Sequence, residues 1–366
     1  MQVKSKDMRG ISRFLGIMLL LVNLVFAGFL VLSGYSSYIH PVSHPYLAAT
    51  GLAFPFFLIV NVAFLLFWIM VYRKYVLLSL MVLLICYKPI HIYFPLNQLK
   101  TSEKETLKVL SYNTLSLAGH APHTGEKKNP VLEYILGCKA DIICLQEVQG
   151  GGELSLNRIK KVLKYPYSHF QQLDGGNGLA CYSCFPIITA KRIDYESDNN
   201  GSVLYLIKIE NDTVAVINNH LESNKLTMDD RELYSSMLRS SKKSDLKGNS
   251  KMLGGKIAEA GAIRARQADV IAEVVKEQLQ KGRSLVVCGD FNDSPLAYPH
   301  RVIGDGLNDA FVEAGSGIGV SYNRNYFYFR IDHILVSKDW TVTECVVDRS
   351  TKASDHYPVW CCMYKK

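Results

Sequence analysis

Acidic residues are nearly absent from the first 96 of the 366 residues. This segment holds seven Lys or Arg residues and one acid, Asp7, so its net charge is +6. The remaining 270 residues carry only the other +2 of the formal charge of +8. The excess positive charge therefore flanks apolar segments, where basic residues usually set membrane orientation. The pI near 8.9 is thus no evidence for a nucleic-acid-binding surface. An apolar content of 48% excludes a disordered chain.

Two long segments near the N-terminus contain no charged residue. Residues 14–33 would form about 30 Å of helix, which matches the hydrocarbon core of a bilayer. The run is longer than the apolar part of a signal peptide and no small-residue cleavage site follows, so we expect a retained helix. Residues 46–72 predict a second span that Pro55 kinks without breaking. Residues 75–96 predict a third, with Lys88 snorkelling toward the interface.

The number of spans decides on which side of the membrane the rest of the chain lies. The basic N-terminus and the pair Arg73-Lys74 are expected in the cytoplasm. Three spans then place the remaining residues outside the cytoplasm, and two spans place them inside. We favour three spans, and thus a multi-pass integral membrane protein. Nothing else explains why the apolar segment 75–96 follows the second span after only two charged residues, Arg73 and Lys74.

A disulfide framework and a zinc-binding pattern are both missing. Eight of the nine cysteines lie beyond residue 96 without regular spacing. Cys181 and Cys184 are separated by two residues, but no second such pair accompanies them. Most of the cysteines are expected to be buried small hydrophobic residues. This usage favours a reducing compartment and so conflicts with the three-span topology, and the sequence leaves the conflict open.

Beyond residue 100, short apolar runs alternate with Gly, Asn and Asp and predict strands, several of them buried on both faces. Helical patterns lie between them at 129–137, 153–164 and 257–280. We therefore expect a linker at 97–105, then one α/β domain at 106–366 with sheets covered by helices. One biased segment, 236–256, carries six basic residues and one acid and predicts a mobile basic loop.

Polar residues stand where the predicted strands stop. Because open sheets bind ligands beyond strand ends, these residues are expected to converge on one cleft. Their carboxylates and amides are the hard oxygen ligands that suit Mg²⁺ or Mn²⁺ rather than zinc or copper. An imidazole beside a carboxylate can act as a general acid or base near neutral pH. The residues are Asn113, Glu147, His220, Asp290, Asn292, Asp332, Asp355 and His356.

Each of these residues also has a structural interpretation. An Asn after a strand is most often a turn residue, which applies to Asn113 and Asn292. Glu147 and Asp332 are harder to explain in this way, because a carboxylate between apolar neighbours is costly to bury without a partner. In strand alternation His333 points away from Asp332, and we interpret it as structural.

Six motifs together resemble the endonuclease/exonuclease/phosphatase superfamily with the DNase I-like fold. They are SYN at 111–113, LQEV at 145–148, NHLES at 219–223, GDFND at 289–293, IDHILVS at 331–337 and SDHYPV at 354–359. The resemblance covers about residues 106–364. It implies a four-layer α/β/β/α sandwich with two central mixed sheets, and hydrolysis of phosphoesters that depends on Mg²⁺ or Mn²⁺.

The resemblance also implies roles for the matching residues. Glu147 corresponds to the principal metal ligand, with Asn113 beside it, and Asp355 lies at or near a metal site. Asp290 and Asn292 correspond to the pair that orients the attacking water and the phosphate. His356, held by Asp332, corresponds to the catalytic imidazole. His220 corresponds to an imidazole that binds the phosphate or protonates the leaving oxygen. The sequence does not decide which imidazole is the base.

Three features favour a lipid or envelope phosphodiester over DNA as substrate. The domain is nearly neutral, it is attached to the bilayer, and the aromatic run 326–329 could form an apolar lip at the cleft. Tyr328 in this run and Arg330 directly after it are predicted to contact the substrate. The alternative is a metal-dependent endonuclease or exonuclease acting on DNA or RNA, because the basic loop could track a nucleic-acid backbone. The motif His220-Leu221 replaces the Pro-Asn of some nucleases and argues against a repair role of the exonuclease III type. A non-catalytic membrane binding module is less favoured, and no protein partner can be inferred.

Overall fold

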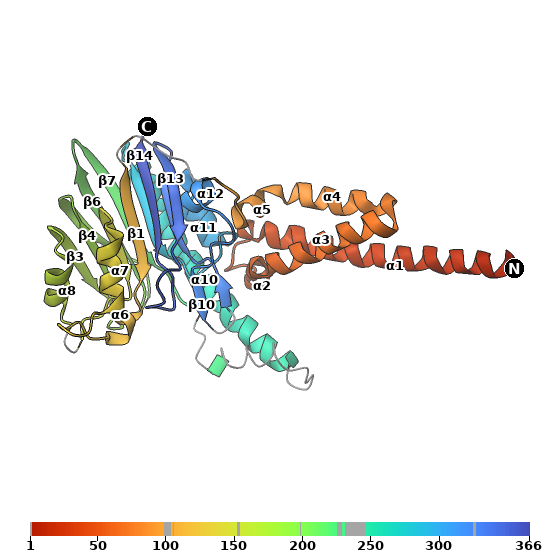
Figure 1. The fold of residues 1–366 in the computed structure, drawn as a ribbon, viewed down its shortest axis with the longest axis horizontal. Helices are drawn as coiled ribbons and strands as arrows, with labels where there is room; N and C mark the ends of the chain where they lie inside the picture. Colours follow the sequence, from red (N-terminus) through yellow and green to blue (C-terminus); the bar gives the residue numbers. More distant parts are fainter. Residues whose placement is uncertain are drawn as a thin grey trace.

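The computed structural model joins a group of apolar helices to a two-sheet domain (Figure 1). It describes residues 2–98, 104, 106–151, 154–197, 199–224, 229–230, 246–324 and 327–366. The strands are β1 Leu107–Asn113, β2 Ile142–Gln146, β3 Tyr167–Gln172, β4 Gly178–Ser183, β5 Ile187–Ile193, β6 Gly201–Ile209, β7 Asp212–His220, β8 Leu285–Asp290, β9 Leu307–Asp309, β10 Tyr322–Arg324, β11 Phe327–Phe329, β12 Asp332–Ser337, β13 Trp340–Val347 and β14 Val359–Lys365. The helices are α1 Gln2–Gly34, η1 Ser36–Tyr38, α2 Pro45–Ala48, η2 Ala49–Ala53, α3 Phe54–Val71, η3 Arg73–Tyr75, α4 Val76–Ile85, α5 Tyr87–Tyr93, α6 Leu115–His120, α7 Pro130–Cys138, α8 Leu156–Leu163, α10 Leu246–Gln280, α11 Tyr298–Ile303 and α12 Ala310–Ala314.

The predicted four-layer sandwich is confirmed. One mixed sheet has the order β13-β14-β1-β2-β4-β3, and the other has the order β5-β6-β7-β8-β12-β9. Helices α7 and α8 cover the outer face of the first sheet, and α10 and α11 cover the outer face of the second. The two inner faces pack against each other and form the central core.

Strand alternation explains why the central strands are buried on both faces. In β8, Val286 and Cys288 point into the core between the sheets, whereas Leu285 and Val287 point toward α10. Successive side chains of a strand point to opposite faces, so a strand between two apolar layers needs apolar residues throughout. Strands of this kind leave polar residues only at their ends, which is where the candidate site forms.

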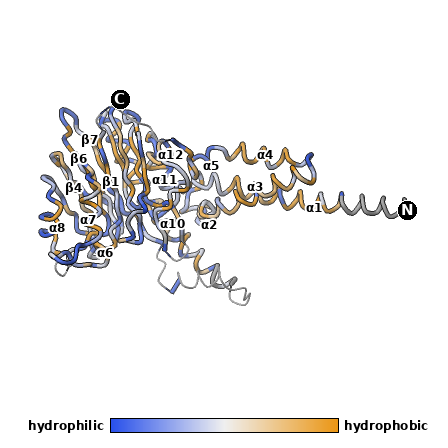
Figure 2. Tube along the Cα trace, viewed as in Figure 1, coloured by the Kyte–Doolittle hydropathy of each residue, from blue (hydrophilic) through white to orange (hydrophobic). Residues whose placement is uncertain are grey.

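The N-terminal helices are the most apolar part of the chain, as the colouring of α1, α3 and α4 shows (Figure 2). Among the described residues, two helical segments are long and apolar enough to cross a membrane, Arg13–Gly34 and Pro45–Val71. Polar groups join the helices at their centre: Asn23 Oδ1 accepts hydrogen bonds from Trp68 Nε1 at 2.8 Å and from Ser79 Oγ at 3.0 Å. Such bonds are typical links between helices in an apolar environment.

The predicted second and third spans, residues 46–72 and 75–96, are not single straight helices. Pro55 does not kink a helix: it lies in the first turn of α3, where its missing N–H costs nothing, and residues 45–53 form the short helices α2 and η2 before it. The third segment bends by 59° between Arg73–Ile85 and Tyr87–Tyr93. It is therefore one broken span or two short helices.

The segment 236–256 is not a single loop. Residues 246–256 form the first turns of α10, and Leu253 is buried there, so the predicted loop is wrong for this part. Residues 236–245 lie outside the described residues, as does most of the predicted linker 97–105. Within the described part of that linker, Asn97 Nδ2 donates hydrogen bonds to the carbonyl oxygens of Val312 and Gly315, both at 2.8 Å.

Candidate active site

The polar strand ends meet at one edge of the sandwich. Asn113 ends β1 and Glu147 directly follows β2, the parallel neighbour of β1. In the second sheet His220 ends β7 and is in register with Asp290, which ends β8. Asp332 begins β12, which is antiparallel to β8, and is in register with Asp290. The two sheets therefore bring all five side chains to the same edge.

The Asn113 amide joins the carboxylates of the two sheets. Its Nδ2 atom donates hydrogen bonds to Glu147 Oε1 and to Asp290 Oδ2, both at 3.1 Å. Its Oδ1 atom accepts a hydrogen bond from the Leu115 backbone N–H at 3.2 Å, which fixes the orientation of the amide. Asn113 therefore holds two acidic groups close together and presents them to the same space.

Two imidazoles flank Asp290. His356 Nδ1 lies 2.9 Å from Asp332 Oδ2, so its other ring nitrogen, Nε2, faces the Asp290 carboxylate at 3.7 Å. His220 Nε2 lies 3.6 Å from Glu147 Oε1 and 3.8 Å from Asp290 Oδ2. Every one of these carboxylates except Glu147 is almost fully buried. The arrangement is an acid–imidazole cluster with Asp290 at its centre.

Burial and neighbouring charges set the protonation states of the cluster. Desolvation raises the pKa of the Asp290 carboxyl to about 6, and the nearby Asp332 charge adds to this rise. Burial alone would lower the pKa of His356, but the charges of Asp332 and Asp290 outweigh it and raise that pKa to about 10. The cluster thus combines an imidazole whose protonated form is favoured with a carboxylate that takes up a proton more readily than an ordinary aspartate does.

The backbone around the cluster adopts conformations that most residues avoid. Glu147 and Asn292 both have positive φ, at 52° and 51°. Gly289 has a φ of 131°, and a Cβ atom there would lie 2.0 Å from the Asn219 carbonyl oxygen. Asn292 is held by two hydrogen bonds, from its N–H to Asp290 Oδ1 at 2.8 Å and from its Nδ2 to the Leu221 oxygen at 2.9 Å. Strained backbone of this kind concentrates at functional sites.

A family model for the "Endonuclease/Exonuclease/phosphatase family" matches residues 110–356, which contain all of these side chains. The chain belongs to the endonuclease/exonuclease/phosphatase family. A second model, described as a domain of unknown function (DUF8431), matches residues 15–93 in the apolar helices.

Relatives of known structure and sequence agree with this assignment. Inositol phosphosphingolipids phospholipase C of Schizosaccharomyces pombe is 26% identical over 212 residues, covering 56% of this chain and 46% of that protein. The chain thus spans less than half the length of that relative. The human Nocturnin catalytic domain with bound sulfate has a TM-score of 0.51 at 18% identity, covering 71% of this chain and 94% of that one. ANGEL2, a 2′,3′-cyclic phosphatase, has a TM-score of 0.50 at 16% identity, covering 73% and 97%. The solved structures indicate the fold.

The residues of the family site fit a divalent cation. Asp290, Asp332 and His356 each offer one ligand atom, and these atoms lie within 4.8 Å of one another. Asp332 Oδ1 and His220 Nδ1 are buried, and neither has a hydrogen-bond partner among the described residues. Glu147 is the most exposed carboxylate of the cluster, with 24% of its side chain accessible. Oxygen-rich donor sets of this kind suit Mg²⁺ or Mn²⁺.

The cluster lies in a cleft with a cavity volume of about 430 Å³, within the usual range for small-molecule sites. Asp355 also lines the cleft, and its Oδ2 lies 3.7 Å from Arg324 Nη1. The sequence-predicted residues that line it are Glu147, His220, Asp290, Asn292, Asp355 and His356.

The two predicted substrate contacts are not confirmed. Among the described residues, Phe329 and Ile331 line the cleft, whereas Tyr328 and Arg330 do not. The prediction for Arg330 is wrong, because its guanidinium is buried and its Nη2 donates a hydrogen bond to the carbonyl oxygen of Ile92 in α5. Tyr328 is more than half exposed on the β10–β11 ribbon.

Sequence reasoning missed several residues that line the cleft or support the strands beside it. The Tyr322 ring packs edge-on against His356 with the ring centroids 5.0 Å apart. Ser321 Oγ accepts hydrogen bonds from the backbone N–H groups of Ile331 and Asp332. Leu52, Ala53 and Phe56 also line the cleft, although they lie in the predicted membrane segment 46–72. No motif marked any of these residues.

Proposed function

We propose that the chain is a membrane-anchored, divalent-metal-dependent phosphodiesterase whose substrate is a lipid phosphodiester. The observation that carries this proposal is the position of the acid–imidazole cluster: it occupies a cleft that residues of the apolar N-terminal helices help to line. A phosphodiesterase site beside an anchor suits a substrate that is itself held in the bilayer.

Glu147 would hold the cation, with the Asn113 amide beside it, since Asn113 Nδ2 donates a hydrogen bond to Glu147 Oε1. Asp355 lines the same cleft and would lie at or near the cation. A divalent cation held by these residues would supply electrostatic stabilisation for the negative charge on the phosphoryl oxygens.

The remaining groups bind the phosphate and move protons. His356 Nε2 and His220 Nε2 both face Asp290, so either N–H can donate to a phosphate oxygen in the cleft. Asp290 is placed to accept the proton of an attacking water, and an imidazole N–H supplies a proton to the leaving oxygen. General acid–base assistance of this kind contributes roughly 10²–10⁴ in rate. Asp332 keeps His356 oriented and protonated.

Charge favours a lipid over a nucleic acid. Among the described residues that line the cleft, none is Lys or Arg. Nucleic-acid binding draws most of its affinity from such residues, because each neutralised phosphate releases counterions. The S. pombe relative, named as a phospholipase C for inositol phosphosphingolipids, supports a lipid substrate as well. The alternative remains a metal-dependent endonuclease or exonuclease acting on DNA or RNA.

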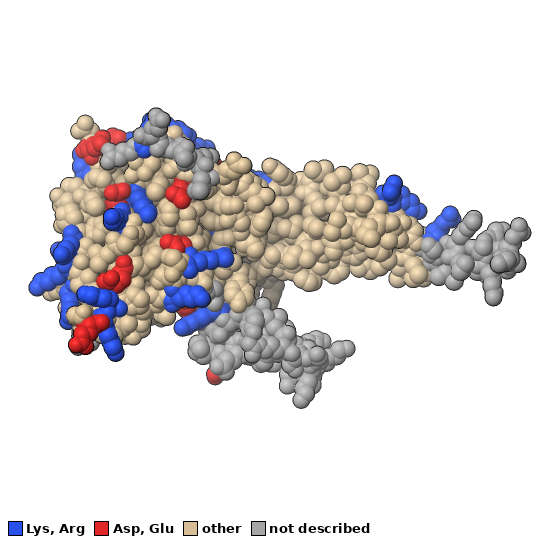
Figure 3. All heavy atoms as spheres, viewed as in Figure 1, with Lys and Arg blue, Asp and Glu red and all other residues tan. Residues whose placement is uncertain are grey.

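The arrangement of the helices supports three spans. Basic side chains gather at the end of the helices that points away from the sandwich (Figure 3). Arg73 and Lys74 form η3 between α3 and α4 at this end, whereas α5 ends beside the catalytic domain. By the charge rule the basic end is cytoplasmic, which places the catalytic domain on the non-cytoplasmic side.

A substrate panel tests the proposed activity. The purified full chain is assayed on bis-p-nitrophenyl phosphate, plasmid DNA, sphingomyelin, phosphatidylinositol and inositol phosphates, with Mg²⁺ and with EDTA. We expect Mg²⁺-dependent turnover of the soluble diester and of at least one lipid. Glu147→Gln should lower both at least about 100-fold, since it alters a cation ligand and the bound cation would contribute several kcal/mol to stabilising the transition state. Glu126→Gln, on an exposed loop, should lower neither. Equal activity of wild type and Glu147→Gln would contradict the site.

Thiol labelling tests the topology. Cys184 is exposed on the catalytic domain. A membrane-impermeant maleimide should label wild-type protein in intact cells and should label the Cys184→Ser variant less. Labelling at Cys184 only after the cells are permeabilised would place the domain in the cytoplasm and support two spans.

A further inference from the structure

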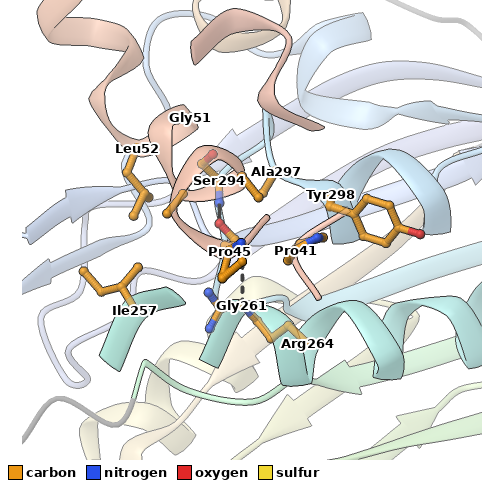
Figure 4. A pocket seen from close by; sticks show the side chains of 13 residues that line it. Pro41, Pro45, Gly51, Leu52, Ile257, Gly261, Arg264, Ser294, Ala297 and Tyr298 are labelled. Atoms are coloured by element: carbon orange, nitrogen blue, oxygen red, sulfur yellow. Dashed lines mark hydrogen bonds and ion pairs between the residues drawn. The ribbon is translucent and has the colours of Figure 1, made fainter. Parts of the chain in front are cut away.

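The connection between α1 and α3 reaches the catalytic domain and stays there. Its short helices α2 and η2 pack on α10 (Figure 4). Ser36 Oγ donates a hydrogen bond to the Leu296 carbonyl oxygen at 3.2 Å, and Arg301 Nε donates one to the Ser37 oxygen at 2.8 Å. His40 Nε2 also lies 3.4 Å from Asp269 Oδ2. The connection is therefore attached at several points.

The loop that follows Asp290 in the candidate active site packs against the N-terminal helices. Leu296 lies six residues after Asp290, and its buried side chain packs in one apolar cluster with Leu30, Phe54 and Tyr93 of the helices. Gly51 fits closely against the same segment, since a Cβ atom there would lie 3.3 Å from the Leu296 carbonyl oxygen. Anchor and active site thus share a core rather than a flexible tether.

This attachment gives the cleft two unlike sides. One side carries the carboxylates and imidazoles around Asp290. The apolar part of the lining comes from the anchor as well as from the sandwich: it comprises Leu52, Ala53 and Phe56 of the anchor, Ile257 of α10, and Phe329 and Ile331. Figure 4 shows the neighbouring pocket between the connection and α10, which Leu52 of η2 and Ile257 of α10 line as well. A site with one charged and one apolar side fits an amphiphile better than a uniformly charged polymer.

The apolar side continues onto the outside of α3. Phe56 has 57% of its surface exposed, and Ile59, one turn further along the helix, has 68%. Residues three apart lie on the same helix face. An apolar path therefore leads from the cleft onto the helix surface that a bilayer would cover.

We infer that the anchor is part of the substrate site: a lipid enters sideways from the bilayer, its phosphodiester reaching the acid–imidazole cluster while its apolar tails stay against Leu52 and Phe56. The inference rests on the proposed lipid phosphodiesterase activity and adds the route and the residues that select the tails. A soluble diester such as bis-p-nitrophenyl phosphate has no tails and needs neither the route nor these residues. Comparing its turnover with that of a lipid therefore separates the role of the acid–imidazole cluster from the role of Leu52 and Phe56.

The test compares two exposed positions on α3 in the full chain reconstituted in phosphatidylcholine vesicles that contain the lipid turned over in the substrate panel. Phe56→Ser is the test variant, and Phe56→Leu is its conservative partner. Leu66→Ser is the matched control, because Leu66 is also 57% exposed and lies ten residues, or about 15 Å, further along the helix. Turnover of the lipid and of bis-p-nitrophenyl phosphate are measured for each, together with the melting temperature.

We expect Phe56→Ser to lower the ratio of lipid to soluble-diester turnover by about tenfold, because an aromatic contact with the tails is lost. Phe56→Leu and Leu66→Ser should keep the ratio within about twofold of wild type. Equal ratios for Phe56→Ser and Leu66→Ser, or an equal loss on both substrates in Phe56→Ser, would overturn the inference and leave the activity standing. Wild-type turnover of the soluble diester with no turnover of any lipid would instead overturn the proposed substrate, and the inference with it.

Discussion

Replacing Asp332 with Asn removes one negative charge from the buried pair that orients His356. The two side chains lie 2.9 Å apart, with 2% and 7% of their surfaces exposed, so water cannot replace the lost charge. Asn keeps the size of Asp and can still accept a hydrogen bond from Nδ1. The substitution therefore tests the charge on His356 and not the packing.

The expected loss follows from the role of the imidazole. If His356 acts as a charged donor, turnover of a soluble diester should fall by about 10²–10⁴, the usual contribution of general acid–base catalysis. This corresponds to about 2.7–5.4 kcal/mol in activation free energy. The assay uses bis-p-nitrophenyl phosphate with the purified full chain, so that access to the bilayer does not enter the measurement.

A second Asp–His pair provides the control. Asp309 Oδ2 lies 2.9 Å from His300 Nε2, with 8% and 11% of these side chains exposed, and neither residue lines the cleft. Asp309→Asn should lower the melting temperature and leave turnover within about threefold of wild type, because a charged hydrogen bond contributes roughly 1.5–3 kcal/mol to stability. A loss of turnover below threefold in Asp332→Asn, or an equal loss in both variants, would refute the role given to His356.

Three further predictions concern the cation, acid stability and the backbone. Glu147→Gln should abolish the rise in melting temperature that Mg²⁺ gives the wild type, and an unchanged rise would remove Glu147 from the cation site. Burial would raise the pKa of Asp309, but the hydrogen bond and charge of His300 lower it overall. Its stabilisation is therefore complete above the ordinary carboxyl pKa of about 4 and is lost progressively as the pH falls from there toward the lowered pKa. The melting temperature of Asp309→Asn should therefore differ less between pH 7 and pH 3 than that of wild type. Gly289→Ala should destabilise the fold by at least about 2 kcal/mol, and a melting curve like that of wild type would show that the backbone at φ 131° tolerates a side chain.

The polar residues at the strand ends could be predicted from the sequence, because burial of the strands leaves polar side chains no other place. A strand between two apolar layers has no place for Glu147, Asp290 or Asp332 except at its ends, and the motifs fixed their order. The structural role predicted for His333 agrees with its contacts, since its Nε2 lies 3.0 Å from the Asp293 carbonyl oxygen. Alternation on the strand gave this orientation.

The anchor's share of the cleft could not be predicted in this way. Leu52 and Phe56 have the composition of any membrane segment, whether they face lipid, another helix or a ligand. The bonds that place them, such as Arg301 to Ser37, join residues more than 250 positions apart. Arg330 was misplaced for the same reason, because its partner Ile92 lies 238 residues away. The start of α10 was missed because its glycines and lysines are typical of a loop, whereas burial of Leu253 stabilises a helix there.

A competition between lipid and nucleic acid in one reaction shows which of the two the cleft hydrolyses. The full chain in vesicles receives a lipid phosphodiester and plasmid DNA in one reaction with Mg²⁺, and release of the phosphorylated headgroup and nicking of the plasmid are followed together. A membrane lipid phosphodiesterase should release headgroup at least about ten times faster per phosphodiester than it nicks DNA, because only the lipid reaches the cleft from the bilayer. Plasmid nicking without headgroup release, abolished by EDTA, would contradict the account and identify the chain as a membrane-bound nuclease.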